Sequence, residues 1–151
     1  MGNNLRPEYQ LIEYDDYWTI PLVGKAVCRF QVDVQLTLQF FEPEDEETIV
    51  WISGEFKLEM DGEEHAFSAE NREKIGPVFF LFRKTVNSAL AHKNGVLEIT
   101  FSEGARLTVA PDPNYESWGV TGVRWLRVVC MPGGDLAVWL ADPPDVDGIK
   151  H

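Results

Sequence analysis

The chain has 151 residues, of which 44% are hydrophobic, and a formal net charge of −12 at pH 7. This length suits a single domain over residues 1–151, which on folding buries roughly 70% of the surface that its unfolded chain exposes. No run reaches the roughly 20 apolar residues of a membrane span, and the first ten residues lack the basic-then-apolar layout of a signal peptide. We therefore expect a cytoplasmic protein without a membrane partner.

The negative charge is concentrated in one segment. Between Glu42 and Glu73 there are twelve acidic residues against two basic ones, a net charge of −10. Such a field repels nucleic acid and attracts basic proteins, so we expect a basic protein partner. The acidic surface expected to bind it comprises Glu44, Asp45, Glu46, Glu47, Asp61, Glu63 and Glu64. The alternative is a solvated face that keeps the protein soluble.

The N-terminal half of the chain predicts strands. Residues 1–14 form an extended lead-in, and residues 18–23 form an edge strand or turn because Pro21 cannot donate to a central ladder. Apolar residues then alternate with polar ones from Val32 to Phe40, which is typical of a half-buried antiparallel strand. A charged loop at 42–47 ends this strand, and further extended stretches follow over residues 48–52 and 55–60.

One helix is predicted, over about residues 77–92. Pro77 suits a first helical turn, and Asn94-Gly95 suits a helix stop. The apolar positions between them follow helical spacing: Val78, Leu81, Phe82, Thr85, Val86, Ala89 and Leu90. We expect this helix to pack on one face of the sheet.

Two hairpins and a tail complete the chain. The first joins residues 96–101 to 105–109, and the second joins 123–129 to 135–140 through a Pro-Gly-Gly turn. Residues 141–151 are rich in Pro and Asp and predict a flexible tail. The whole pattern predicts an α+β fold, with a mostly antiparallel sheet and one main helix.

No motif predicts catalysis, a metal or a cofactor. Cys28 and Cys130 are isolated, and with three scattered histidines they give no zinc spacing. His65 and His92 lack a nucleophile in a recognised triad order. We therefore expect no catalytic residues, no metal and no cofactor, and a protein that is not an enzyme.

Two aromatic clusters are the remaining candidates for binding. Tyr115, Glu116 and Trp118 form either a pocket wall or a packed structural corner. A second group, Arg124, Trp125 and Arg127, is a possible anchor, because Trp and Arg dominate many interfaces.

The C-terminal third carries a resemblance. The sequence YESW at 115–118, followed by PGGDLAVW at 132–139, resembles the signature of an uncharacterised, actinobacterial-type domain family. The similarity runs from about Trp18 to Trp139. By size, acidity and layout the chain also resembles small immunity proteins of bacterial toxin systems.

These observations lead to one main expectation of function. It is a non-enzymatic acidic protein of immunity type, which neutralises a cognate bacterial toxin by protein–protein binding. The alternative is a small-ligand-binding or regulatory domain that uses Tyr115, Glu116 and Trp118 as its pocket. A structural subunit of a homo-oligomer is a third possibility, and the sequence does not fix the oligomeric state.

Overall fold

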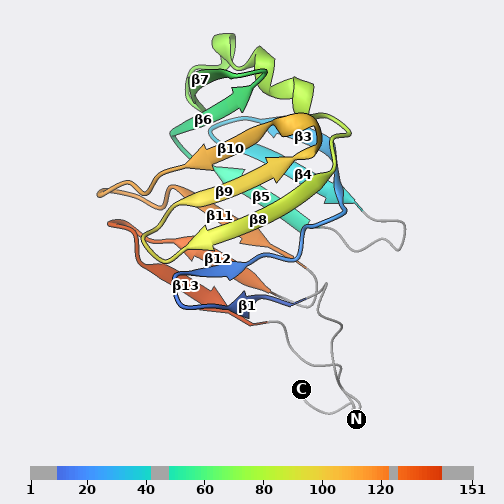
Figure 1. Cartoon of the computed structure of the whole chain (residues 1–151). Helices are drawn as coiled ribbons and strands as arrows, with labels where there is room; N and C mark the ends of the chain where they lie inside the picture. The colour runs from blue at the N-terminus through green and yellow to red at the C-terminus, as the bar shows by residue number, and fades with distance from the viewer. Residues whose placement is uncertain (1–9, 42–47, 123–125, 141–151) are drawn as a thin grey trace, which may run out of the picture.

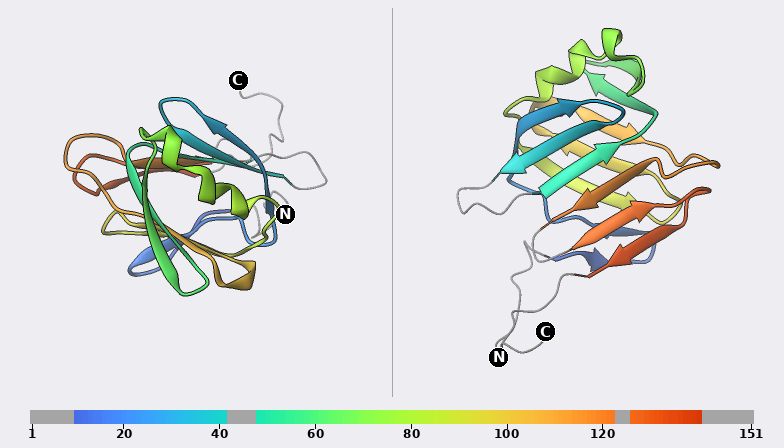
Figure 2. Two further views of the ribbon diagram at one scale, coloured as in Figure 1. Left: turned by 90° about the horizontal axis from the view of Figure 1, so that it is seen from above. Right: turned by 180° about the vertical axis from the view of Figure 1, so that it is seen from behind.

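The computed structural model describes residues 10–41, 48–122 and 126–140, and these form two antiparallel β-sheets stacked face to face (Figures 1 and 2). The seven-stranded sheet has the order β1-β2-β8-β9-β10-β6-β7, and the six-stranded sheet has the order β13-β12-β11-β5-β4-β3. One continuous hydrophobic core lies between them. The described chain is therefore an all-β sandwich.

The strands of the seven-stranded sheet are short to medium in length. They are β1 (Ile12–Glu13), β2 (Tyr17–Thr19), β8 (Val86–His92), β9 (Leu97–Phe101), β10 (Arg106–Val109), β6 (Glu55–Met60) and β7 (Glu63–Ser68). The predicted hairpin of residues 96–101 and 105–109 is confirmed as β9 and β10, in which Leu107 lies opposite Ile99. Residues 63–68 form an edge strand that the polar sequence did not predict.

The six-stranded sheet holds the other half of the core. Its strands are β13 (Leu136–Trp139), β12 (Arg127–Cys130), β11 (Trp118–Thr121), β5 (Thr48–Ile52), β4 (Leu36–Phe41) and β3 (Ala26–Val32). The alternation predicted from Val32 holds for β4, in which Leu36, Leu38 and Phe40 are fully buried. Val34 is instead exposed, because the chain turns there between β3 and β4.

The predicted helix over residues 77–92 is wrong. The helical elements in the described ranges are 3-10 turns: η2 (Arg72–Lys74), η3 (Gly76–Leu81) and η4 (Ser102–Gly104). The second half of the predicted helix is β8, which pairs with both β2 and β9. The α+β class is therefore corrected to all-β.

The misleading spacing has a physical cause. A 3-10 helix repeats every three residues, so Ile75, Val78 and Leu81 share its buried face. In β8 the register shifts between Val86 and Ser88, and after this bulge Ala89 and Ala91 point inward at the period of a strand. The three-residue repeat of η3, followed by the two-residue repeat of β8 with its bulge, places apolar residues at positions that resemble the spacing of an α-helix.

Two glycine turns join the sheets at one point. The β8–β9 turn at Gly95 approaches the β12–β13 turn so closely that a Cβ on Gly95 would lie 2.7 Å from the Cα of Gly134. Both glycines have positive φ, 102° and 111°. The predicted helix stop at Asn94-Gly95 is thus a hairpin turn, and glycine is required there by both conformation and space.

Residues 1–9, which belong to the predicted lead-in, and 141–151, the predicted tail, lie outside the described residues. Within the lead-in, Ile12 and Glu13 form β1 and pair with Thr19 and Trp18. No helix in the described ranges is both long and apolar enough to cross a membrane.

Candidate functional site

The described residues of the acidic surface, Asp61, Glu63 and Glu64, belong to the β6–β7 hairpin at one end of the sandwich (Figure 1). Asp61 and Gly62 form its turn, with φ of 53° and 79°. These values suit a type I′ hairpin turn, which favours Asp-Gly. Asp61, Glu63 and Glu64 are all exposed there. Glu44, Asp45, Glu46 and Glu47, predicted for the same surface, lie outside the described residues.

Three exposed phenylalanines lie on and directly after η3, and one of them, Phe80, lines a cleft with this hairpin. In η3, Val78 and Leu81 face the core, whereas Phe79 and Phe80 of the same turn, and Phe82 directly after it, are exposed. Their side chains are 44%, 69% and 49% exposed. We call these three residues the η3 aromatic patch. Exposed aromatic side chains that lie close together in the chain are typical of interaction surfaces.

The η3 aromatic patch is held between two edge strands. On one side, the Phe79 ring packs edge-to-face on Phe30 of β3, with centroids 5.0 Å apart. On the other side, Phe80 and Pro77 line a cleft against β6 and β7. The views from above and behind show η3 across this end of the sandwich (Figure 2).

Backbone strain follows the aromatic patch immediately. Arg83 has a φ of 71°, in the left-handed region that non-glycine residues seldom adopt. Its amide donates a 2.7 Å hydrogen bond to the carbonyl of Val27, which fixes this turn to β3. The guanidinium carbon lies 5.8 Å from the centroid of the Phe82 ring. Such strain persists where the surroundings hold it, often at functional sites.

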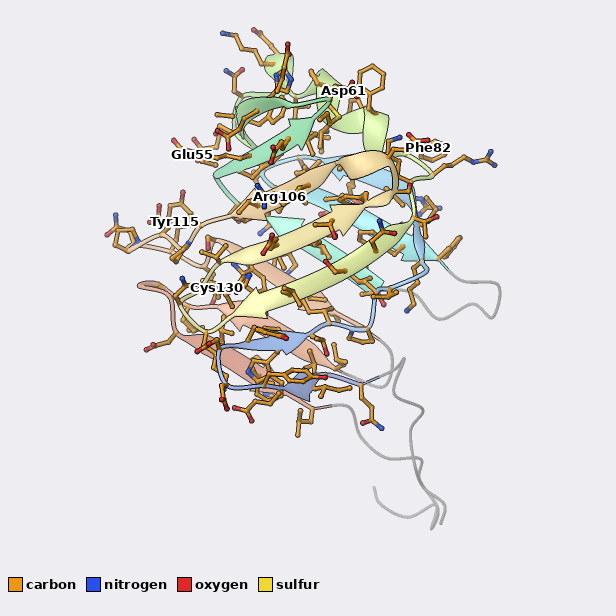
Figure 3. The ribbon with its side chains drawn as sticks, in the orientation of Figure 1. Glu55, Asp61, Phe82, Arg106, Tyr115 and Cys130 are labelled. Atoms are coloured by element: carbon orange, nitrogen blue, oxygen red, sulfur yellow. The ribbon has the colours of Figure 1, made fainter. Side chains whose placement is uncertain are left out.

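The cleft has a volume of about 400 Å³. Its lining combines apolar and charged side chains: Met60, Asp61, Glu63, His65, Pro77, Phe80, Lys84, Glu103 and Ala105. Figure 3 shows Asp61 and Phe82 at the same end of the molecule, far from Cys130. The cleft therefore lies where the acidic hairpin meets the η3 aromatic patch.

The charges in the cleft are partly paired. Lys84 Nζ donates a 2.5 Å hydrogen bond to Glu103 Oε1, and this bond, together with the charge of Lys84, lowers the pKa of the Glu103 carboxyl. His65 Nε2 lies 3.8 Å from Glu63 Oε1. With Lys84 bonded to Glu103, Asp61 and Glu63 are the cleft carboxylates without a lysine or arginine partner within the part of the chain that the structure describes.

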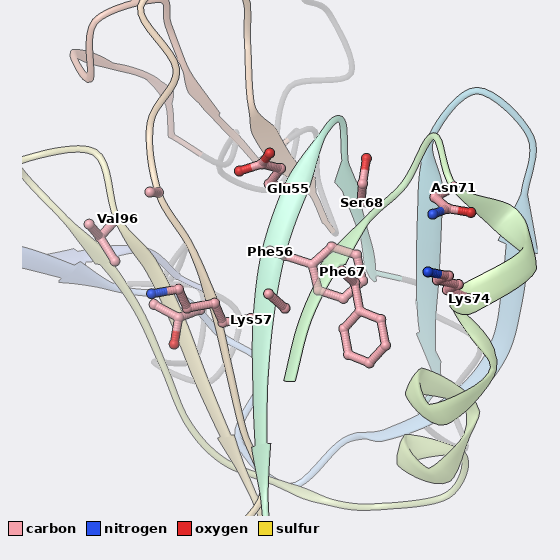
Figure 4. Close-up of a pocket in the computed structure, with 11 residues that line it drawn as sticks. Glu55, Phe56, Lys57, Phe67, Ser68, Asn71, Lys74 and Val96 are labelled. Atoms are coloured by element: carbon pink, nitrogen blue, oxygen red, sulfur yellow. The ribbon is translucent and has the colours of Figure 1, made fainter. Parts of the chain in front are cut away.

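A second hollow, of about 520 Å³, lies around the same hairpin. Figure 4 shows Lys57 pointing toward Val96, whereas Phe67 points toward Lys74. Its lining residues include neither histidine nor cysteine, and its charged side chains are Glu55, Lys57 and Lys74. Among the residues described, no group of three metal-ligating side chains is close enough to hold a metal ion.

The three residues predicted to form a pocket, Tyr115, Glu116 and Trp118, differ in their exposure to solvent. Trp118 is fully buried, whereas Tyr115 and Glu116 are exposed. The Tyr115 hydroxyl lies against Gly54, and none of the three residues lines either hollow. Desolvation and the nearby Asp112 carboxylate raise the pKa of Tyr115. This arrangement favours a structural corner over a shared pocket wall.

The second predicted group is only partly described. Arg124 and Trp125 lie outside the described residues, and Arg127 is exposed on β12. Its guanidinium carbon lies 5.1 Å from the ring centroid of Trp139 on β13. Both residues are at the end of the sandwich opposite the β6–β7 hairpin (Figure 1).

Comparison with known proteins supplies the family. Residues 18–140 match the family of unknown function DUF6188. The chain belongs to this family. The family range covers the cleft and every strand of both sheets except β1 and the first residue of β2, so the sandwich is the fold of the matched region. The expected membership of an uncharacterised domain family is confirmed, with nearly the predicted bounds. No curated protein and no solved structure matches the chain.

The sequence does not predict the η3 aromatic patch, because the spacing places Phe82 on the buried face of the expected helix. A usable signal was present. Gly76-Pro77 and the three-residue spacing of Ile75, Val78 and Leu81 suit a 3-10 turn, which would leave the intervening phenylalanines outside.

Proposed function

We propose that this protein is a non-enzymatic binding protein that uses the β6–β7 hairpin and the η3 aromatic patch to bind a basic protein. The single observation that carries the proposal is the cleft that these two features line together. Exposed carboxylates at Asp61 and Glu63 share one cleft with the exposed ring of Phe80. An aromatic anchor with a charged surround is the usual composition of a protein-binding site.

Charge and aromatic surface contribute differently to such binding. The net charge of −12 and its concentration between residues 42 and 73 would steer a basic partner toward this end of the molecule. Burial of the phenylalanine rings would then supply affinity at short range. The acidic surface alone is also compatible with simple solubility, so the exposed rings are what favour an interface.

In its specific form, the proposal is an immunity-type protein of actinobacterial origin that neutralises a cognate toxin. A toxin that binds nucleic acid must be basic around its site, and it would be complementary to this surface. The YESW and PGGDLAVW segments fit this form as a scaffold signature, because Trp118 and Gly134 lie at the joint between the sheets.

The test is the association rate with a partner captured at low salt, measured by biolayer interferometry for matched charge variants. One variant combines Asp61→Asn, Glu63→Gln and Glu64→Gln, and a second neutralises Glu44, Asp45, Glu46 and Glu47. The control combines Glu13→Gln, Asp15→Asn and Asp16→Asn, which lie around β1 at the far end (Figure 1). We expect association about tenfold slower for the hairpin variant at low ionic strength and nearly unchanged for the control.

Equal rates for the hairpin variant and the control would reject the acidic surface as the interface. The immunity form has its own readout, which is the growth of cells that produce the partner with or without this protein. We expect co-expression to restore growth. Tight binding without restored growth would reject the immunity form and leave the binding function in place.

A further inference from the structure

Phe80 forms an open aromatic wall. It is the most exposed of the three phenylalanines at 69%, and it shares the cleft with Pro77 of the same 3-10 turn. Asp61 and Glu63 come from the facing hairpin. The cleft thus presents an aromatic face and two carboxylates to the same space of about 400 Å³, a volume within the range of about 300–1,000 Å³ typical of ligand sites.

The charge of the cleft defines its occupant. Five titratable groups face it: Asp61, Glu63, His65, Lys84 and Glu103. Lys84 is bonded to Glu103, so these two charges largely cancel. Asp61 and Glu63 remain, and His65 lies near Glu63 at 3.8 Å. Apart from His65, Asp61 and Glu63 contribute two negative charges that no lysine or arginine among the described residues pairs with, so the complement of the cleft is a cation with an apolar or planar body.

We propose that the cleft binds an arginine side chain from a basic segment of the partner. A guanidinium group is planar and weakly hydrated, so it stacks on an aromatic face such as Phe80 while its edge donates to carboxylates. A lysine ammonium carries the same charge but cannot form the two parallel hydrogen bonds of a guanidinium with a carboxylate. This inference rests on the proposed function and names the side chain that the site recognises.

The experiment is an NMR titration of the full chain labelled with ¹⁵N. The probe is a blocked pentapeptide with a central arginine between glycine and serine residues. Matched peptides carry lysine, or citrulline, which has nearly the shape of arginine without its charge. We expect the arginine peptide to shift the amides of Asp61, Glu63 and Phe80, with affinity about fivefold above the lysine peptide and higher still above the citrulline peptide.

Three variants test the residues themselves. Phe80→Ala removes an exposed ring, and we expect about fivefold weaker binding. Asp61→Asn keeps a residue that tolerates the φ of 53° at the turn, so a loss of binding would report the charge. The control is Glu55→Gln, because Glu55 is an exposed carboxylate on β6 of the same hairpin that does not line this cleft. We expect it to bind as the unaltered chain does.

The outcomes separate the cleft from the wider surface. Equal binding of the arginine and lysine peptides, or equal losses in Glu55→Gln and Asp61→Asn, would overturn the arginine site while leaving charge-steered binding intact. Shifts that map to residues away from the cleft would overturn it as well. If the arginine peptide binds as expected but the captured partner associates at rates independent of the hairpin charges, the cleft stands and the proposed function fails.

Discussion

The indole Nε1–H of Trp118 donates a 2.8 Å hydrogen bond to the carbonyl oxygen of Gly95, across the interface between the two sheets. The same oxygen accepts a 3.4 Å hydrogen bond from the Sγ of Cys130. Trp118 and Cys130 belong to β11 and β12, whereas Gly95 belongs to the β8–β9 turn of the other sheet. One carbonyl therefore ties the signature segment of the chain to the opposite sheet.

Removing the indole donor should loosen this joint. We expect Trp118→Phe to lower the free energy of unfolding by about 2–4 kcal/mol, because it leaves a buried carbonyl underbonded and vacates part of the core. Urea unfolding followed by circular dichroism measures the change. Trp139→Phe is the matched control on an exposed indole, with an expected change within about 0.5 kcal/mol. Similar losses in both variants would contradict a special role for Trp118.

The two glycine turns give a second test. Gly133 has a φ of 92° with open space around it, whereas a Cβ on Gly95 would meet the Gly134 backbone at 2.7 Å and Pro111 Cβ at 2.9 Å. We expect Gly133→Ala to cost about 1–2 kcal/mol for its conformation alone. Gly95→Ala should cost about 3 kcal/mol or more, because backbone atoms must move as well. Equal melting shifts for the two variants would show that the turns are not in contact in solution.

Thiol reactivity reports the same joint in the folded protein. Burial raises the pKa of Cys130, so at neutral pH its thiol is both inaccessible and protonated. Cys28 is partly exposed. We therefore expect iodoacetamide to modify Cys28 first, and Cys130 only when the structure opens. Mass spectrometry of the Cys28→Ser variant isolates the slow reaction, and Trp118→Phe should accelerate it. Rapid labelling of Cys130 in the unaltered fold would contradict the buried joint.

Tyr115 predicts a dependence of stability on alkaline pH. Its folded pKa is raised above the unfolded value of about 10, chiefly by desolvation and next by Asp112. A raised pKa means that the folded state favours the neutral phenol. The contribution of Tyr115 to the stability of the fold is therefore complete below about pH 10 and is lost as the pH rises through the folded pKa. We expect stability to fall more steeply above pH 10 in the unaltered chain than in Tyr115→Phe. Parallel pH profiles by chemical denaturation would refute this.

The outer face of the seven-stranded sheet offers a test of exposed ion pairs. Arg106 donates to Glu59 at 2.7 Å and to Glu98 at 3.3 Å, and it is about half exposed. Water screens such pairs, so we expect Arg106→Gln to lower stability by less than about 1 kcal/mol. The loss should shrink further in 0.5 M salt, taken as roughly the ionic strength at which surface charges are screened. A loss that is large and independent of salt would indicate a role in packing.

The sequence alone determined much of the strand pattern and the charge. Leu97, Ile99 and Leu107 alternate with polar residues around Ser102-Glu103-Gly104, and local alternation plus a turn was enough to predict the β9–β10 hairpin. The acidic excess between residues 42 and 73 is likewise a property of composition. Both inferences depend only on the local sequence and not on which other segments pack against it.

Only the tertiary structure determined the secondary structure of residues 76–92, and with it the fold class. Val86 to His92 form a strand because β2 and β9 lie on either side of them and satisfy their backbone hydrogen bonds. β2 lies far from β8 in sequence, so local spacing does not reveal this partner, whereas β9 follows β8 directly after the turn at Gly95. The same holds for the site: Phe80 is exposed because Val78 and Leu81 take the inward face of η3, and its cleft exists because β7 forms the edge beside it. Exposure and concavity arise from how the elements pack, whereas composition and alternation belong to each segment by itself.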